Sequence, residues 1–76
     1  MNDTVVTNYL RDLVGLIVEK AKEAKEERDS SNTDYDIGRL MAYHEVVSLI
    51  QQQAEVFGLS NDEIGMPQIN PEVDLL

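Results

Sequence analysis

DYDIGRLMAYHEVVSLIQQQAEVF, residues 34–57, is the stretch that decides the fold of this chain. Its apolar residues recur at three- and four-residue steps, which predicts one long helix. A helix on the surface of a small fold needs an apolar stripe only roughly 100° wide. Here the stripe covers about half of the helix circumference, and the excess width predicts two neighbours, one in the same chain and one in a second copy. The residues of this wide stripe are Leu40, Ala42, Tyr43, Val46, Val47, Leu49, Ile50, Ala54 and Phe57.

A second long helix is predicted over residues 4–29, before the polar break Asp29–Thr33. Thr33 and Asp36 have the spacing of a capping box, so the helix of residues 34–57 begins directly after this break. Such a short connection predicts an antiparallel helical hairpin. Val14 and Val18 fall off the apolar stripe of the first helix and are expected to be exposed or to meet a second subunit. That stripe consists of Val6, Leu10, Leu13, Ile17, Ala21 and Ala24.

Residues 59–76 are expected to form a short helical turn and an extended apolar tail. Gly58 is suited to end the preceding helix, and Ser60 with Glu63 has the spacing of a capping box for a helical turn through Ile64. A last turn can begin with Asn70 as its cap and Pro71 in the first helical position. The tail is expected to pack on the hairpin or on a second subunit, or to dock on a partner. The candidate partner-binding residues are Ile69, Val73, Leu75 and Leu76.

These elements predict an all-α fold in which residues 1–58 form the hairpin and residues 59–76 pack against it or against a second subunit. A chain of 76 residues without cysteine has a small core and no disulfide to support it. We therefore expect two hairpins to form a four-helix bundle, as a homodimer or a higher oligomer. Arg39 lies within the apolar stripe and is predicted to pair with Glu23, Glu27 or an acid of the second subunit. The predicted dimer and core interface contains Gly38, Arg39, Ala42, Tyr43, Val46, Leu49, Ile50 and Phe57.

No residue pattern in the sequence indicates a catalytic, cofactor-binding or metal site. His44 is the one histidine and there is no cysteine, so thiolate ligands and a multi-histidine zinc site are excluded within one chain. His44 lies opposite Val46 and Ile50 on the helical wheel, in a polar side that ends at Glu55 and is expected to face solvent. The sequence therefore predicts a protein without enzymatic activity.

The chain has a net charge of −9, from fifteen acids and six bases, and residues 59–76 contain no base. Such a charge repels phosphate backbones and anionic lipid, so neither nucleic acid nor a membrane is an expected partner. No apolar run is long enough to span a bilayer, and Asp3 stands where a signal peptide has a basic residue, so a cytoplasmic location is expected. Two functions fit these observations. One is a homodimeric protein–protein interaction module; the other is an acidic inhibitor of the nucleic-acid-mimic type, as in phages or mobile elements, that blocks a basic surface of another protein.

Overall fold

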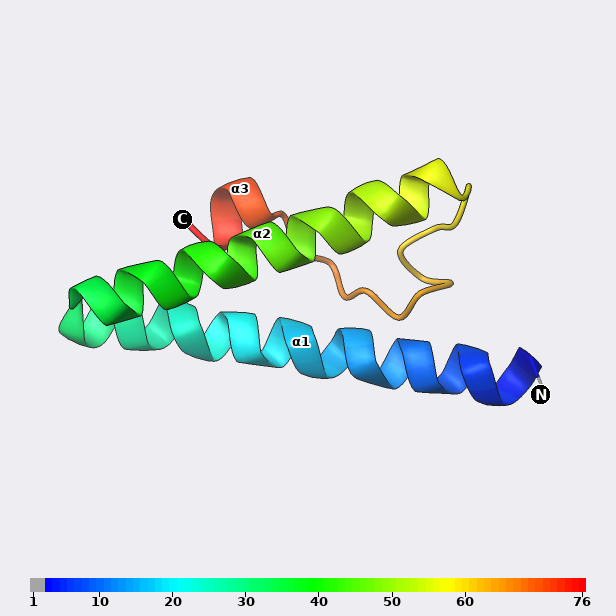
Figure 1. Cartoon of the computed structure of the whole chain (residues 1–76), viewed down its shortest axis with the longest axis horizontal. Helices are drawn as coiled ribbons and strands as arrows, with labels where there is room; N and C mark the ends of the chain where they lie inside the picture. The colour runs from blue at the N-terminus through cyan, green and yellow to red at the C-terminus, as the bar shows by residue number, and fades with distance from the viewer. Residues whose placement is uncertain (1–2) are drawn as a thin grey trace.

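The computed structural model describes residues 3–76, so the first two residues of the predicted hairpin region lie outside it. Two long helices, α1 (Asp3–Ser31) and α2 (Asp34–Val56), lie side by side and antiparallel, and the short helix α3 (Pro71–Asp74) follows near the end of the chain (Figure 1). Residues 3–76 contain no strand. The predicted all-α class and the helical hairpin are therefore confirmed. Across the same residues, none of the helices combines the length and the apolar character that crossing a membrane requires.

The reversal between α1 and α2 depends on two local features. Asn32 has a φ of 51°, in the left-handed region that asparagine adopts more readily than most residues. The predicted capping box then opens α2: the Thr33 hydroxyl accepts a hydrogen bond from the Asp36 amide at 3.2 Å, and the Asp36 carboxylate accepts one from the Thr33 amide at 3.4 Å. The same carboxylate accepts a hydrogen bond from the Thr33 hydroxyl at 2.8 Å.

These hydrogen bonds predict a pH-dependent contribution of Asp36 to stability. The hydrogen bond from the Thr33 hydroxyl is the main cause that holds the pKa of Asp36 below its usual value of 3.8. A lowered folded-state pKa stabilises the fold at every pH above the unfolded-state pKa, and this contribution is lost as the pH falls through the folded-state pKa. We expect Asp36→Asn to be less stable than the natural sequence at neutral pH and the difference to shrink below about pH 4. Urea unfolding of both proteins at neutral and acidic pH measures this difference in stability. A difference that does not depend on pH would contradict the role given to the Asp36 carboxylate.

The end of α2 redirects the chain toward α1. Gly58 has a φ of 70°, its amide donates to the Glu55 carbonyl at 3.0 Å, and the Leu59 amide donates to the Ala54 carbonyl at 2.8 Å. This pair of hydrogen bonds is the Schellman arrangement that glycine favours at a helix end. The predicted role of Gly58 as the end of the helix is confirmed.

The turn predicted from Ser60 to Ile64 forms, with the Ile64 amide donating to the Ser60 carbonyl at 3.4 Å, but it is a single turn and not a longer helix. The Ser60 and Glu63 side chains exchange hydrogen bonds with each other's amides at 3.0 and 3.1 Å, so the predicted capping box itself forms. The turn does not continue as a helix because Gly65 has a φ of 73° and reverses the backbone direction. The one helix after α2 is α3, which begins as predicted, with Asn70 as cap and Pro71 in its first turn.

Residues 59–76 return along one face of the hairpin, which we call the covered face. At the open end of the hairpin, Arg11 donates a hydrogen bond to the Asp62 carbonyl, and Gly65 lies against the backbone of Arg11. Near the turn between the long helices, Lys25 and Arg28 donate to the Leu76 carbonyl at 2.6 and 2.7 Å. The returning segment passes behind α2 in Figure 1, and it supplies a third layer of apolar side chains to the core.

The core lies between α1, α2 and the returning segment, and it differs from the expected one on α1. Val14 and Val18 are almost completely buried, so the expectation that they would be exposed or meet a second subunit is wrong. The returning segment covers their side of α1, which moves the buried arc away from the predicted stripe. The buried apolar residues are Val14, Val18, Ala21, Ala24, Leu40, Val47, Ala54, Ile64, Met66, Ile69 and Leu75.

Candidate interaction surface

The face of the hairpin opposite residues 59–76, here called the open face, carries exposed apolar side chains from both long helices. On α2, the returning segment contacts His44 and Gln51, and the stripe through Leu49 lies on the other side of the helix. On α1, it contacts Arg11 and Lys25, again on the side away from the exposed apolar residues. The exposed large apolar residues of this face include Val6, Tyr9, Leu10, Leu13 and Leu16 on α1, with Val46, Leu49 and Phe57 on α2 or directly after it.

The apolar area of the open face is large for a chain of this size. These eight side chains have exposed fractions between 38% for Leu10 and 70% for Phe57. If a fully exposed large apolar side chain offers roughly 150–200 Å², the face exposes on the order of 700 Å². The largest apolar patch on a typical monomeric protein is about 300–600 Å² and is often functional. The open face is therefore the strongest candidate for a binding surface on the described part of the chain.

The open face has two distinct halves. Most of the exposed apolar residues lie in its open half, defined here as α1 up to Leu16 and α2 from Val46 onward, and Tyr35 lies in the other half. Toward the turn between the helices, its turn half carries ion pairs: Arg39 with Glu27, and Lys20 with Glu23 at 3.5 Å. The first of these is one of the pairs predicted from the sequence, and it is confirmed. The Arg39 guanidinium also lies 5.5 Å from the centre of the Tyr43 ring, a cation–π distance.

A small apolar cavity opens at the open end, between α1 and α2, and we call it the Phe57 hollow. Its volume is about 230 Å³. The sequence did not predict this feature, because its walls combine both long helices with the turn after α2. It is lined by Leu10, Val14, Ile50, Gln53, Ala54, Phe57, Leu59 and Ile64.

The residues predicted as a dimer and core interface fall into two groups. Gly38, Ala42, Val46, Leu49 and Phe57 are exposed, and Tyr43 and Ile50 are half-buried against the core. Arg39 is also half-buried, in its ion pair with Glu27. The structure thus brings Val46, Leu49 and Phe57 together with α1 residues that the sequence interpretation had assigned to the core.

The residues of the candidate partner-binding tail also divide. Ile69 and Leu75 are buried in the core of this chain, whereas Val73 and Leu76 are exposed. In this structure, therefore, two of the four side chains anchor the tail to the hairpin. Only Val73 and Leu76 remain accessible to another molecule.

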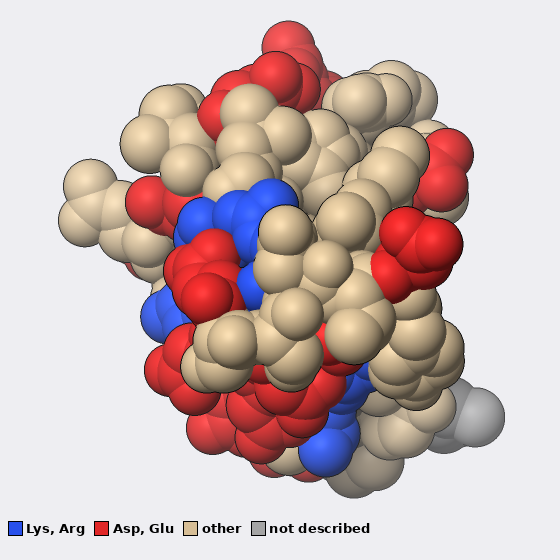
Figure 2. All heavy atoms as spheres, turned by 90° about the vertical axis from the view of Figure 1, so that its left-hand side faces the viewer, with Lys and Arg blue, Asp and Glu red and all other residues tan. Residues whose placement is uncertain are grey.

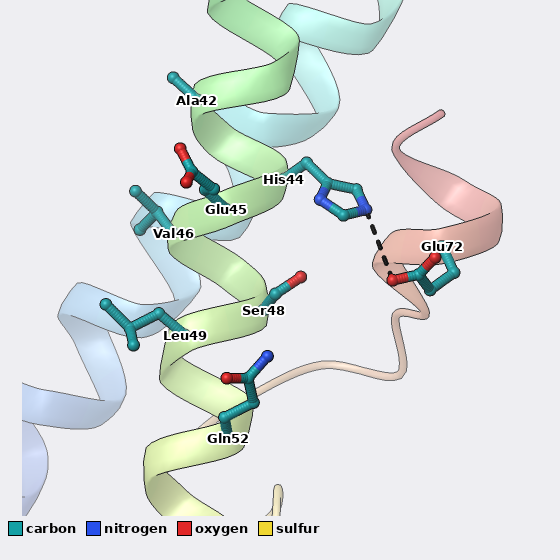
Figure 3. Close-up of a pocket in the computed structure, with 8 residues that line it drawn as sticks. All are labelled: Ala42, His44, Glu45, Val46, Ser48, Leu49, Gln52 and Glu72. Carbon is teal, nitrogen blue, oxygen red and sulfur yellow. Dashed lines mark ion pairs between the residues drawn. The ribbon is translucent and has the colours of Figure 1, made fainter.

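The polar side of α2 is less exposed than expected at His44 and Gln51, which corrects the sequence interpretation. The Gln51 side chain donates to the Ile69 carbonyl at 3.1 Å. His44 points toward α3, its side chain is 23% exposed, and its Nε2 lies 3.9 Å from Glu72 Oε1 (Figure 3). That distance is too long for a hydrogen bond, and the contact is an ion pair only when the imidazole is protonated. The prediction failed because Ile69 and α3, distant in sequence, pack on this side of α2.

The surface at the turn end of the hairpin carries acids and bases side by side (Figure 2). Asp29 accepts contacts from Lys25 at 3.3 Å and from Arg28 at 3.1 Å. Exposed ion pairs of this kind each contribute little to stability, with a typical range of about 0–1 kcal/mol. This end of the molecule is a mixed surface and not a uniformly acidic one.

Two further findings concern possible functions of the surface. Among residues 3–76, no three histidine, aspartate or glutamate side chains lie close enough together to hold a metal ion. The chain was also compared with protein-family models, curated proteins and solved structures, and none of them matches it.

Proposed function

We propose that this chain is a non-catalytic interaction module that forms a homodimer through its open face and binds another protein with the surface that remains. The observation that supports the proposal is the apolar area of the open face, on the order of 700 Å². A standard specific protein interface covers about 800 Å² of each partner. The open face therefore has the size that one second copy would cover.

The small size of the chain supports the same proposal. Folded chains of this length bury a low share of their surface, and small folds usually need a disulfide, a metal or a second subunit. The sequence contains no cysteine. A second copy against Tyr9, Leu49 and Phe57 would complete a four-helix bundle whose core includes side chains now facing solvent.

Sedimentation equilibrium of the full chain over a range of concentrations tests the dimer. We expect a mass of twice the chain mass at micromolar concentrations, with dissociation on dilution. A monomer at every concentration would contradict the proposal. For the second function, affinity capture with the intact chain and with its Val73→Asp variant, changed at an exposed tail position, would show whether the tail contributes to binding the other protein.

The acidic-inhibitor function is the second candidate, and its support is the net charge of −9 with no base in residues 59–76. The interleaved bases at the turn end give it less support than a continuous acidic surface would. Such an inhibitor should compete with nucleic acid for its target, and its affinity should fall steeply with salt. A complex with a target that is insensitive to salt would argue against it.

A further inference from the structure

We propose that the second copy covers only the open half of the open face and uses the Phe57 hollow as its anchor point. This inference rests on the proposed homodimer and specifies where its interface lies. It leaves the turn half of the face, with Arg39 and Glu27, exposed to solvent.

The distribution of apolar side chains supports this placement. Tyr9, Leu13 and Leu16 on α1 and Val46 and Leu49 on α2 are exposed and lie in the open half. These side chains are between 38% and 67% exposed, so a second copy would remove a large apolar area from water. Because the open half supplies the apolar surface of both partners, two copies match each other best when their open halves meet.

The charges of the turn half oppose a partner there. Arg39 and Glu27 already satisfy each other within the chain, as do Lys20 and Glu23. Covering these pairs would remove their hydration without offering them better partners, and that desolvation can exceed the attraction between the charges. The ion pairs therefore mark the boundary of the dimer interface.

The Phe57 hollow supplies an anchor within the open half. Its volume of about 230 Å³ exceeds the roughly 150 Å³ that holds a benzene ring in an engineered apolar cavity. One bulky apolar side chain of the second copy would fill it. Residues that fill well-packed pockets from which water is excluded carry much of the binding free energy of an interface. In a two-fold dimer this contact occurs twice.

This placement changes the interface expected from the sequence. Gly38 lies on the turn side of Arg39 and falls outside it, as Arg39 itself does. Tyr9, Leu13 and Leu16, which had not been included, fall inside it. Leu49 and Phe57 belong both to the interface expected from the sequence and to the interface placed on the open half.

A pair of matched substitutions on exposed positions of α2 tests the placement. Leu49 lies in the open half and is 62% exposed, and Tyr35 lies in the turn half and is 74% exposed. We expect Leu49→Asp to raise the dimer dissociation constant by at least about 30-fold. Tyr35→Asp should change it by less than about threefold, as expected for a position outside the interface. Circular dichroism checks that both proteins stay helical, which their exposed positions favour.

A third variant tests the hollow. Ala54 lines it from inside the chain, so Ala54→Leu would fill it with the chain's own side chain. We expect Ala54→Leu to weaken the dimer by about tenfold or more with the helical content unchanged. A dimer that tolerates this substitution would remove the hollow from the interface.

The outcomes separate this inference from the proposed function. A natural sequence that is monomeric at all concentrations would overturn both. A natural sequence that is dimeric, but is dissociated by Tyr35→Asp and not by Leu49→Asp, would overturn the placement and leave the homodimer standing. Dissociation by Leu49→Asp alone would support both.

Discussion

Replacing Gly65 with alanine is expected to destabilise the fold by about 2–5 kcal/mol, more than any other single-methyl addition at a glycine of this chain. Two causes combine. The backbone of Gly65 has a φ of 73°, which costs a residue with a Cβ about 1–2 kcal/mol. The added Cβ would also lie 2.8 Å from both Cα and Cβ of Arg11 and 2.9 Å from its carbonyl oxygen. Because these neighbours are largely helix backbone, relief requires residues 59–76 to move away from α1.

Gly58 and Gly15 provide matched controls for this prediction. Gly58 has a nearly equal φ of 70° but open space around the position of a Cβ, so Gly58→Ala should show the backbone cost alone, about 1–2 kcal/mol. Gly15 lies within α1 with open space beside it, so Gly15→Ala should stabilise the protein by about 0.5–1 kcal/mol. Urea unfolding of the three variants provides the comparison. Equal losses at Gly65 and Gly58 would show that the close approach to Arg11 has no energetic effect.

The features that the sequence predicted correctly depend on residues close together in the chain. The capping box needs only Thr33 and Asp36, and the end of α2 needs only Gly58 and its neighbours. The Arg39–Glu27 pair spans a short turn, and two antiparallel helices of known length determine its register. Local hydrogen bonds and helical periodicity are therefore sufficient to predict the hairpin.

The sequence-based predictions that the structure corrected failed for a different reason. Val14 and Val18 are buried, and the side of α2 around His44 is partly covered, because residues 59–76 pack there. Helical periodicity shows that a helix has an apolar stripe, but it does not show which edge of a wide stripe a third layer will cover. Arg11 and Gly65 lie against each other across more than fifty positions of sequence, and no local pattern predicts that contact.

The candidate interaction surface was predictable only in part for the same reason. The wide stripe of α2 indicated more apolar residues than one neighbouring helix can cover, and Leu49 and Phe57 are exposed in the structure. The contribution of α1 followed only from the packing of the returning segment, which buries Val14 and leaves Tyr9 and Leu13 exposed. The Phe57 hollow required the positions of three chain segments, so the sequence alone gave no indication of it.

The second large loss of folding stability is expected when Leu75 is replaced by alanine. The same replacement of its neighbour Leu76 should have almost no effect. Leu75 is 2% exposed and Leu76 is 61% exposed, although the sequence interpretation treated them alike as candidate partner contacts. Leu75→Ala should cost about 2–5 kcal/mol, as for other buried leucines, whereas Leu76→Ala should change stability by less than about 0.5 kcal/mol. Urea unfolding measures both, and hydrogen exchange shows whether the loss is confined to residues 59–76 or extends to α1 and α2.

The extent of the structural loss in Leu75→Ala shows whether residues 59–76 serve mainly to cover the hairpin or are free to contact a partner. The Leu76 carbonyl accepts hydrogen bonds from Lys25 and Arg28, so Leu76→Ala leaves these backbone contacts in place while removing an exposed side chain. If Leu75→Ala releases residues 59–76, the covered face becomes a second apolar surface, and the variant should aggregate or form larger oligomers. Equal stability of the two variants would instead show that the tail contributes little to the fold, and Leu75 would again be a candidate contact for a partner.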